Sequence, residues 1–409
     1  MKIPPELCAR CKGYKRLCSL PKCPILEAFQ AQVRAYIKIR GLEAQGSTPP
    51  SIIVGEYGYP EVSLYYMVPP EVYGEEARVY EDPVGWSEAR ASLGDIIRYR
   101  GELLSAKLDV RVDRPETLYE REVGLAGLSE KPVDSEVHLE RMPVPSLKFD
   151  GITKPLGPRA PARLIKVTGN ASLNPNVEKT LWDDVKASEA IVELYNRGVN
   201  VYTLQKLLSL GFLGRKPRRR IVPTRWAITA VDDTISRGLR EKLRGAPEVE
   251  DSRIYYNEYL GNKFLIIVKP GPGRFEWLEI WQPRSFWIRG VGNPVVWRVY
   301  EDPRGNVSSM DGGFSAARLA VLELLSSHGR RADVVIIREI TPSYYAPVGN
   351  WHIRETVRGA FTRRPLAVNP TLGELSSIIG EKVNYDPNII ESKLRLLKPG
   401  RTLEDYWSI

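Results

Sequence analysis

The chain has 409 residues, of which 43% are hydrophobic and 27% charged, a composition typical of a soluble globular protein and not of a disordered one. Its net charge of +9 favours an anionic partner, and nucleic acid is the commonest of these. No apolar run approaches the roughly 18 residues that span a bilayer, and the N-terminus lacks a secretory signal, so we expect a cytoplasmic protein without membrane association.

All four cysteines lie near the N-terminus with the spacing C-x2-C-x6-C-x4-C. Four thiolates can close the tetrahedral shell of one zinc ion, and a segment this short has almost no core, so the metal would supply its folding free energy. We therefore predict a structural zinc knuckle ligated by Cys8, Cys11, Cys18 and Cys23. An iron–sulfur cluster, suggested by Pro24 after the last cysteine, and two disulfides remain alternatives.

Apolar periodicity predicts helices and strands in mixed order along the first part of the chain. The predicted helices cover residues 24–40, 86–104, 177–196, 201–210 and 224–243. The predicted strands lie within residues 51–68 and over residues 108–112 and 164–168. Between residues 142 and 161 proline and glycine are dense, which indicates a long loop or a boundary.

The second part of the chain begins with strands separated by glycine and proline, which predicts an antiparallel sheet. These strands cover residues 254–259, 264–269, 275–281 and 295–300. A helix over 312–327, a buried strand over 332–339 and helices over 350–362, 372–379 and 388–397 follow. The predicted fold class is therefore α+β, with a zinc knuckle (1–24), an N-terminal α+β region (25–160), a main α+β domain (161–398) and a C-terminal peptide (399–409).

A basic run precedes the predicted helix over 224–243, with six basic residues among the eleven from Arg215 to Arg225. Like charges at this density repel one another, and a phosphate backbone would relieve that repulsion. We predict that this run contacts nucleic acid through Arg215, Lys216, Arg218, Arg219, Arg220 and Arg225. A solvated loop without a partner is the alternative.

The helix that follows carries a carboxylate in its buried stripe, because Asp232 lies one turn after Ile228 whereas Asp233 points away. A buried charge is costly unless it is paired or binds a metal. Asp232 is therefore expected to pair with an arginine such as Arg225, or to line a site for a divalent cation.

The predicted helix over 350–362 places Arg354 and Arg358 one turn apart, a spacing that can clamp a phosphate or a carboxylate. An exposed helix face with Glu355 as internal partner is the alternative. No hydrolase or phosphate-loop motif is present. If the chain is an enzyme, Asp232, Glu355 and His352 are the candidate catalytic residues, with magnesium or manganese as the cofactor.

The last ten residues contain Leu403, Tyr406 and Trp407 in a hydrophobic-x-x-aromatic-aromatic pattern. In a single 3₁₀ turn these side chains can share one face and fill an apolar pocket of a sliding clamp. Gly400 stands where such a peptide usually has glutamine. The alternative is that the tail packs on the protein's own core.

These features together resemble the archaeal Nre family of DNA repair proteins. The resemblance rests on the four-cysteine knuckle, the clamp-type tail, and the stretches Val222-Pro-Thr-Arg-Trp-Ala-Ile-Thr-Ala-Val-Asp-Asp233 and Asn350-Trp-His-Ile-Arg-Glu355. It implies a role in the DNA-damage response and contact with the sliding clamp PCNA, without implying a catalytic activity.

We therefore expect a DNA repair factor that binds PCNA through its tail and DNA through basic and aromatic surfaces. Two other hypotheses fit the same residues. One is a metal-dependent nuclease or nucleotide-acting enzyme built around Asp232. The other is an RNA-binding or ribosome-associated factor, since a zinc knuckle with basic patches fits that class as well.

Overall fold

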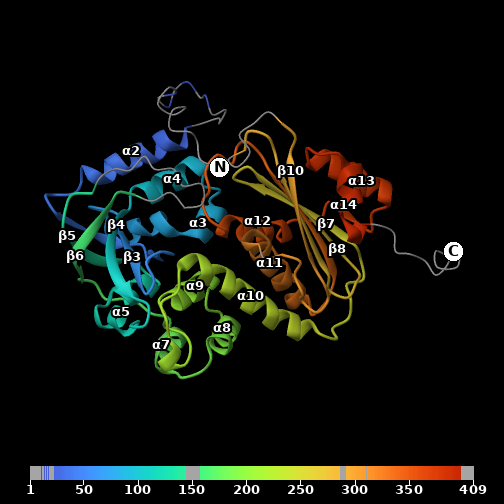
Figure 1. The fold of residues 1–409 in the computed structure, drawn as a ribbon. Coiled ribbons are helices and arrows are strands. Elements are labelled where there is room, and N and C mark those ends of the chain that lie inside the picture. Colours follow the sequence, from blue (N-terminus) through green and yellow to red (C-terminus); the bar gives the residue numbers. More distant parts are fainter. Residues whose placement is uncertain are drawn as a thin grey trace. The chain divides into compact units, whose positions relative to one another are not determined.

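The computed structural model describes residues 11, 13, 15, 17, 23–143, 157–285, 292–309 and 311–397. It has a mixed α+β fold with two six-stranded sheets (Figure 1). The chain divides into two compact units, Met1–Gly238 with Tyr345–Trp351 and Leu239–Tyr344 with His352–Ile409. Among the described residues, every helix is too short or too polar to cross a membrane.

The first unit contains a mixed sheet with the strand order β1-β5-β6-β4-β3-β2. Its strands are β1 (Glu43–Thr48), β2 (Ile52–Val54), β3 (Glu61–Val68), β4 (Leu104–Arg111), β5 (Val133–Leu139) and β6 (Arg159–Val167). The β4–β6 pair is parallel and the other pairs are antiparallel. Residues 160 and 161, between which the sequence suggested a domain boundary, lie inside β6.

Helices before β4 pack closely against one another in this unit. A side chain at Gly101 would place its Cβ 2.5 Å from the Cβ of Ala31, so the two small residues allow α2 and α4 to approach. The helices and turns up to β6 are α2 (Pro24–Tyr36), η1 (Gly74–Glu81), α3 (Pro83–Glu88), α4 (Leu93–Gly101), α5 (Glu116–Glu120) and α6 (Val123–Leu128).

A helical segment follows β6 and contains α7 (Pro175–Trp182), α8 (Ala187–Asn196), α9 (Val201–Ser209), the 3₁₀ turn η2 (Lys216–Arg218) and α10 (Thr224–Leu243). The boundary between the two units falls within α10, after Gly238. The predicted bounds of α10 are confirmed. The predicted helix over 177–196 is instead two helices, because the chain is extended at Asp183 and again at Lys186.

The predicted helix over 86–104 is also wrong as a single element. The side chain of Ser92 accepts a hydrogen bond from the Asp95 backbone N–H and the Asp95 carboxylate bonds back to Ser92, so a capping box starts α4 there. Leu104 already belongs to β4. The strands β1 and β5 were not predicted, since their polar residues hide the alternation of buried positions.

The second unit contains a sheet with the strand order β10-β9-β11-β8-β7-β12. Its strands are β7 (Arg253–Tyr259), β8 (Asn262–Lys269), β9 (Phe275–Trp281), β10 (Val295–Glu301), β11 (Asp333–Ile340) and β12 (Ala367–Val368). The predicted antiparallel sheet is corrected in one respect, because β11 inserts between β8 and β9 and runs parallel to β9.

The helices of this unit are α11 (Gly312–His328), α12 (Trp351–Phe361), α13 (Leu372–Lys382) and α14 (Pro387–Lys393), followed by the 3₁₀ turn η3 (Arg395–Leu397). A core cluster joins aliphatic side chains of β7, β8, β9 and β11 with α13, α14 and η3. Leu265, Leu278, Ile337 and Ile379 are fully buried in this cluster, which fixes the C-terminal helices on the sheet.

Several buried carboxylates in the second unit are paired with arginines. Glu276 pairs with Arg298, Asp333 with Arg274, and Glu301 accepts hydrogen bonds from both Arg318 and Arg240, at 2.5 Å each. The Glu276 carboxylate also accepts the backbone N–H groups of residues 395 and 396 at 2.9 and 2.8 Å, so it fixes η3 to β9. Removing one member of such a pair would leave an uncompensated buried charge.

Candidate nucleic-acid interface

The basic residues from Arg215 to Arg220 form a loop that closes on itself between α9 and α10. Gly211 has a φ of +75°, and a Cβ there would lie 2.7 Å from the carbonyl carbon of Arg220, so glycine is required where the two ends of the loop meet. The Val222 N–H donates to the Ser209 carbonyl at 2.8 Å and completes the closure. We call residues 215–220 the basic loop.

One cation of the basic loop holds it in place. Arg219 donates through Nη1 to the Leu181 carbonyl and through Nη2 to the Asp183 carbonyl, both at 2.7 Å, and through Nε to the Gly214 carbonyl at 2.9 Å. These acceptors include carbonyls at the C-terminal end of α7, where a cation is also favoured by the helix dipole. The Lys216 backbone N–H adds a bond to the Asp184 carboxylate at 2.6 Å. Arg219 therefore positions the loop.

The other cations of the loop are directed to solvent. Arg215, Lys216, Arg218 and Arg220 are exposed, and Arg220 donates to two loop carbonyls, those of Pro217 and Arg219. Exposed guanidinium and ammonium groups held on one short loop are suited to bind phosphate oxygens. The predicted basic run is thus exposed as expected, apart from Arg219.

Arg225 lies at the start of α10 and forms a solvent-exposed ion pair with Glu56 at 3.5 Å. The expectation that it pairs with Asp232 is therefore wrong. Asp232 is fully buried, as its place in the apolar stripe predicted, and accepts a hydrogen bond from Gln205 Nε2 of α9 at 3.0 Å. Asp233 points away and pairs with Arg237 at 2.8 Å. Across the described ranges, no group of three His, Cys, Asp or Glu side chains is placed to hold a metal ion.

Lys206, next to Gln205 on α9, is the most strongly perturbed cation of this region. Burial lowers its pKa to about 8, and the nearby Glu81 carboxylate offsets only part of this effect. Its Nζ donates to the Pro50 carbonyl between β1 and β2 at 3.2 Å. The α9 helix thus bonds to α10 through Gln205 and to the sheet side of the unit through Lys206.

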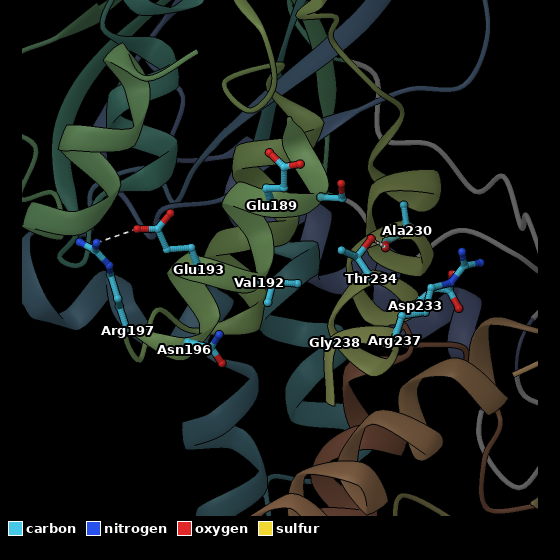
Figure 2. A pocket seen from close by; sticks show the side chains of 11 residues that line it. Glu189, Val192, Glu193, Asn196, Arg197, Ala230, Asp233, Thr234, Arg237 and Gly238 are labelled. Carbon is cyan, nitrogen blue, oxygen red and sulfur yellow. Dashed lines mark hydrogen bonds and ion pairs between the residues drawn. The ribbon is translucent and has the colours of Figure 1, made fainter. Parts of the chain in front are cut away.

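A groove of about 910 Å³ lies between α8 and α10 (Figure 2). Val192, Ala230 and Gly238 contribute its apolar part. Both arginines that line it are paired with lining carboxylates, Arg197 with Glu193 at 2.6 Å and Arg237 with Asp233, and Glu189 adds a further carboxylate, so the groove offers no excess of positive charge to a phosphate.

The candidate residues on α12 belong to the second unit and differ in their exposure. Arg354 is only 1% exposed, so the alternative of an exposed helix face is wrong for this residue. Arg358 donates to Glu323 at 2.6 and 2.7 Å and to Glu355 at 2.8 Å, which matches the alternative of an internal partner. His352 is buried, with its ring centroid 5.1 Å from that of Tyr344. Asp232 belongs to the first unit and His352 and Glu355 to the second.

Several predicted site residues lie outside the described residues. These are two of the four predicted zinc ligands, Cys8 and Cys18, and the clamp-binding residues Leu403, Tyr406 and Trp407. Cys11 is buried and Cys23 partly exposed. The zinc knuckle and the clamp-binding tail therefore stay predictions.

Sequence reasoning missed two exposed aromatic residues near the basic loop. Trp182 is the last residue of α7, between the two residues whose carbonyls bind Arg219. Tyr59 lies in the loop between β2 and β3 and stacks on Trp226 of α10. Their exposure depends on contacts between distant segments, so no local pattern in the sequence indicates it.

Comparison with known proteins matches nearly the whole chain to one family. The family model described as "Archaeal Nre, N-terminal" matches residues 17–288, and "Archaeal Nre, C-terminal" matches residues 300–406. The relatives named DNA repair protein NreA are 36% identical, the one from Archaeoglobus fulgidus over 88% of this chain and 89% of its own length, the one from Haloferax volcanii over 82% of each. NreB of A. fulgidus is 33% identical over 96% of this chain and 97% of its own. No solved structure matches significantly.

The contacts of Arg219 predict that it matters for stability while its neighbour does not. Arg219→Ala should lower the free energy of unfolding by about 1–3 kcal/mol, because it removes three charge-assisted hydrogen bonds to carbonyls. Arg218→Ala, the matched control, should change it by less than about 0.5 kcal/mol, since its side chain is exposed. Urea denaturation of both variants measures the difference, and equal stabilities would contradict the assigned role of Arg219.

Proposed function

The chain belongs to the archaeal Nre family, and we propose that it is a DNA repair factor that contacts DNA through the basic loop and the sliding clamp through its C-terminal peptide. The observation that supports the DNA contact is that one cation of the loop is bonded internally while the others are exposed. Arg219 is bonded to three carbonyls, while its neighbours Arg215, Lys216 and Arg218 are exposed. A loop that is fixed in place binds phosphates with a smaller loss of conformational entropy than a flexible one.

The proposal for the clamp rests on the sequence of the tail. Leu403, Tyr406 and Trp407 have the spacing with which a 3₁₀ turn presents one aliphatic and two aromatic side chains to an apolar pocket. Such aromatic anchors commonly dominate the binding energy of a peptide. The tail would hold the protein on DNA that carries a clamp, and the basic loop would then act at a high local concentration of DNA.

The N-terminal cysteines are proposed to hold one structural zinc ion through Cys8, Cys11, Cys18 and Cys23. The argument is the donor set: four thiolates within sixteen residues match a closed tetrahedral shell, which leaves no open position for chemistry. We assign this metal a role in folding the N-terminal segment.

Neutralising the exposed cations of the basic loop tests the DNA contact. The variant R215Q/K216Q/R218Q keeps Arg219, so the loop retains its attachment to α7. It should weaken DNA binding and lower the slope of log affinity against log salt by about 2, because roughly 0.7–0.9 counterions are released per phosphate contact. Fluorescence anisotropy at several salt concentrations measures both quantities. K131Q/R163Q/K166Q removes the same charge from exposed positions elsewhere in the first unit and should leave the slope near the wild-type value; equal effects of the two variants would refute the assignment.

Alanine at the two tail aromatics tests the clamp contact. Y406A/W407A should weaken binding to immobilised PCNA at least about tenfold, since two anchoring side chains are lost. Ser408→Ala serves as the matched control and should bind like the wild type. Unchanged binding of the double variant would remove the tail from the proposed function.

Metal analysis tests the zinc proposal. The purified chain should contain one zinc ion per molecule, and Cys8→Ser or Cys18→Ser should reduce zinc retention, because three thiolates leave the coordination shell open. Mass spectrometry under native conditions gives the stoichiometry. Finding iron with acid-labile sulfide would show an iron–sulfur cluster and contradict the zinc proposal. A metal-free chain with four oxidised cysteines would contradict it in favour of two disulfides.

A further inference from the structure

We propose that two aromatic pairs beside the basic loop, each with at least one exposed ring, bind unpaired bases, so that this surface selects single-stranded over double-stranded DNA. The pairs are Tyr59 with Trp226 and Tyr119 with Trp182. We call these four residues and the basic loop the aromatic–basic strip. The inference rests on the proposed function and specifies the form of DNA that the loop contacts.

The first pair is a preformed stacking surface. The rings of Tyr59 and Trp226 are nearly parallel, with an interplanar angle of 17° and centroids 6.1 Å apart, yet the two residues remain 48% and 54% exposed. Large aromatic side chains are normally more buried than this, because their apolar surface gains free energy from leaving water. Gly58 (φ +97°) makes the tight turn that presents Tyr59, since a Cβ there would lie 2.4 Å from the Glu61 carbonyl oxygen.

A cation lies beside this pair. Arg225 precedes Trp226 on α10, is 62% exposed in its side chain, and pairs with Glu56 at 3.5 Å. Exposed ion pairs of this kind are weak, so a phosphate can take the place of the carboxylate at little cost. A base on Trp226 and its phosphate on Arg225 would thus be bound by adjacent residues.

The second pair lies where the basic loop meets α7. Trp182 is 60% exposed, and its ring meets that of Tyr119 of α5 edge to face at a centroid distance of 5.4 Å. The same residues that bind Arg219, Leu181 and Asp183, flank Trp182 in the chain. The attachment that fixes the basic loop therefore also fixes the position of Trp182 relative to the loop.

Backbone hydrogen bonds connect the loop to the first pair as well. The Ile221 N–H donates to the Val112 carbonyl at 2.8 Å, and the Val112 N–H donates to the Pro60 carbonyl at 3.0 Å. Residues 60, 112 and 221 are thus adjacent, which places the segment after the loop beside the residue that follows Tyr59. Hydrogen bonds of residues 219 and 221 accordingly connect the basic loop to the segments that carry both aromatic pairs.

Rings that alternate with cations match the chemistry of a single strand. An unpaired strand presents bases that stack on aromatic faces and phosphates that bind Arg and Lys, and stacking contributes about a five- to hundredfold gain in affinity per base. In a duplex the faces of the bases are already stacked on each other, so exposed tryptophans add little there. A simple phosphate-binding loop would need the cations but not the rings.

Alanine at each tryptophan tests this assignment. In the full chain, Trp226→Ala and Trp182→Ala should each weaken binding of a fluorescein-labelled dT20 oligonucleotide by at least about fivefold. Binding of a 20-base-pair duplex should change less than twofold. Trp226→Phe should restore most of the single-strand affinity, because the ring face is kept. Trp297→Ala on β10 is the matched control, since Trp297 is 53% exposed but belongs to the second unit.

The outcomes separate this inference from the proposed function. If both tryptophan variants bind dT20 like the wild type while R215Q/K216Q/R218Q binds weakly, the aromatic inference is wrong and the DNA contact of the loop stands. If all three bind like the wild type, the DNA contact of the loop fails as well. Equal losses on the duplex and on dT20 overturn the selectivity for single strands. A stronger wild-type affinity for an rU20 oligonucleotide than for dT20, lost in the same variants, would reassign the surface to RNA.

Discussion

The three hydrogen bonds of Arg219 are the constraint on which the candidate interface depends. They tie the basic loop to the end of α7 and, through the neighbouring residues, set where Trp182 lies. Lysine could keep the charge at this position, but a single ammonium on a flexible stem cannot reach three carbonyls with the planar geometry of a guanidinium. The six cations look equivalent in the sequence but differ in the structure. Arg219 holds the loop in its conformation, whereas the others present their positive charge at the surface.

The local sequence predicted helices and strands well where proline or glycine marks the ends of the element. Helix α10 and strand β9 were predicted to the residue, since Pro223 precedes the one and glycine and proline bound the other. The prediction of one helix over 86–104 was wrong because a capping box at Ser92 begins a new helix within this range. The insertion of β11 between β8 and β9 could not be predicted, because strand order is set by contacts between distant segments.

The same limit applies to the site. The exposure of the basic run followed from charge repulsion alone, and the burial of Asp232 followed from its place in the apolar stripe. The attachment of Arg219 and the pairing of Tyr59 with Trp226 involve partners far away in the sequence. The burial of Arg354 was not predicted, because arginine is rarely buried. In the second unit, arginines pair with buried carboxylates such as Glu276 and Glu301, so the number of arginines is a poor measure of the positive charge available to a partner.

The burial of Lys206 gives the first unit a proton-linked response. Its pKa is lowered to about 8 in the folded chain, against a usual value of 10.5, so the unfolded chain binds more protons between these two values. This residue therefore makes the fold gain stability as pH rises from about 8 to about 10.5, by at most about 1.4 kcal/mol per pH unit. Below pH 8 the folded chain keeps the Lys206 ammonium, so the full cost of desolvating this charge lowers the free energy of unfolding. Deprotonation of Lys206 at alkaline pH therefore removes a desolvation cost at the point where α9 meets the turn after β1, while ordinary lysines and arginines keep their charge.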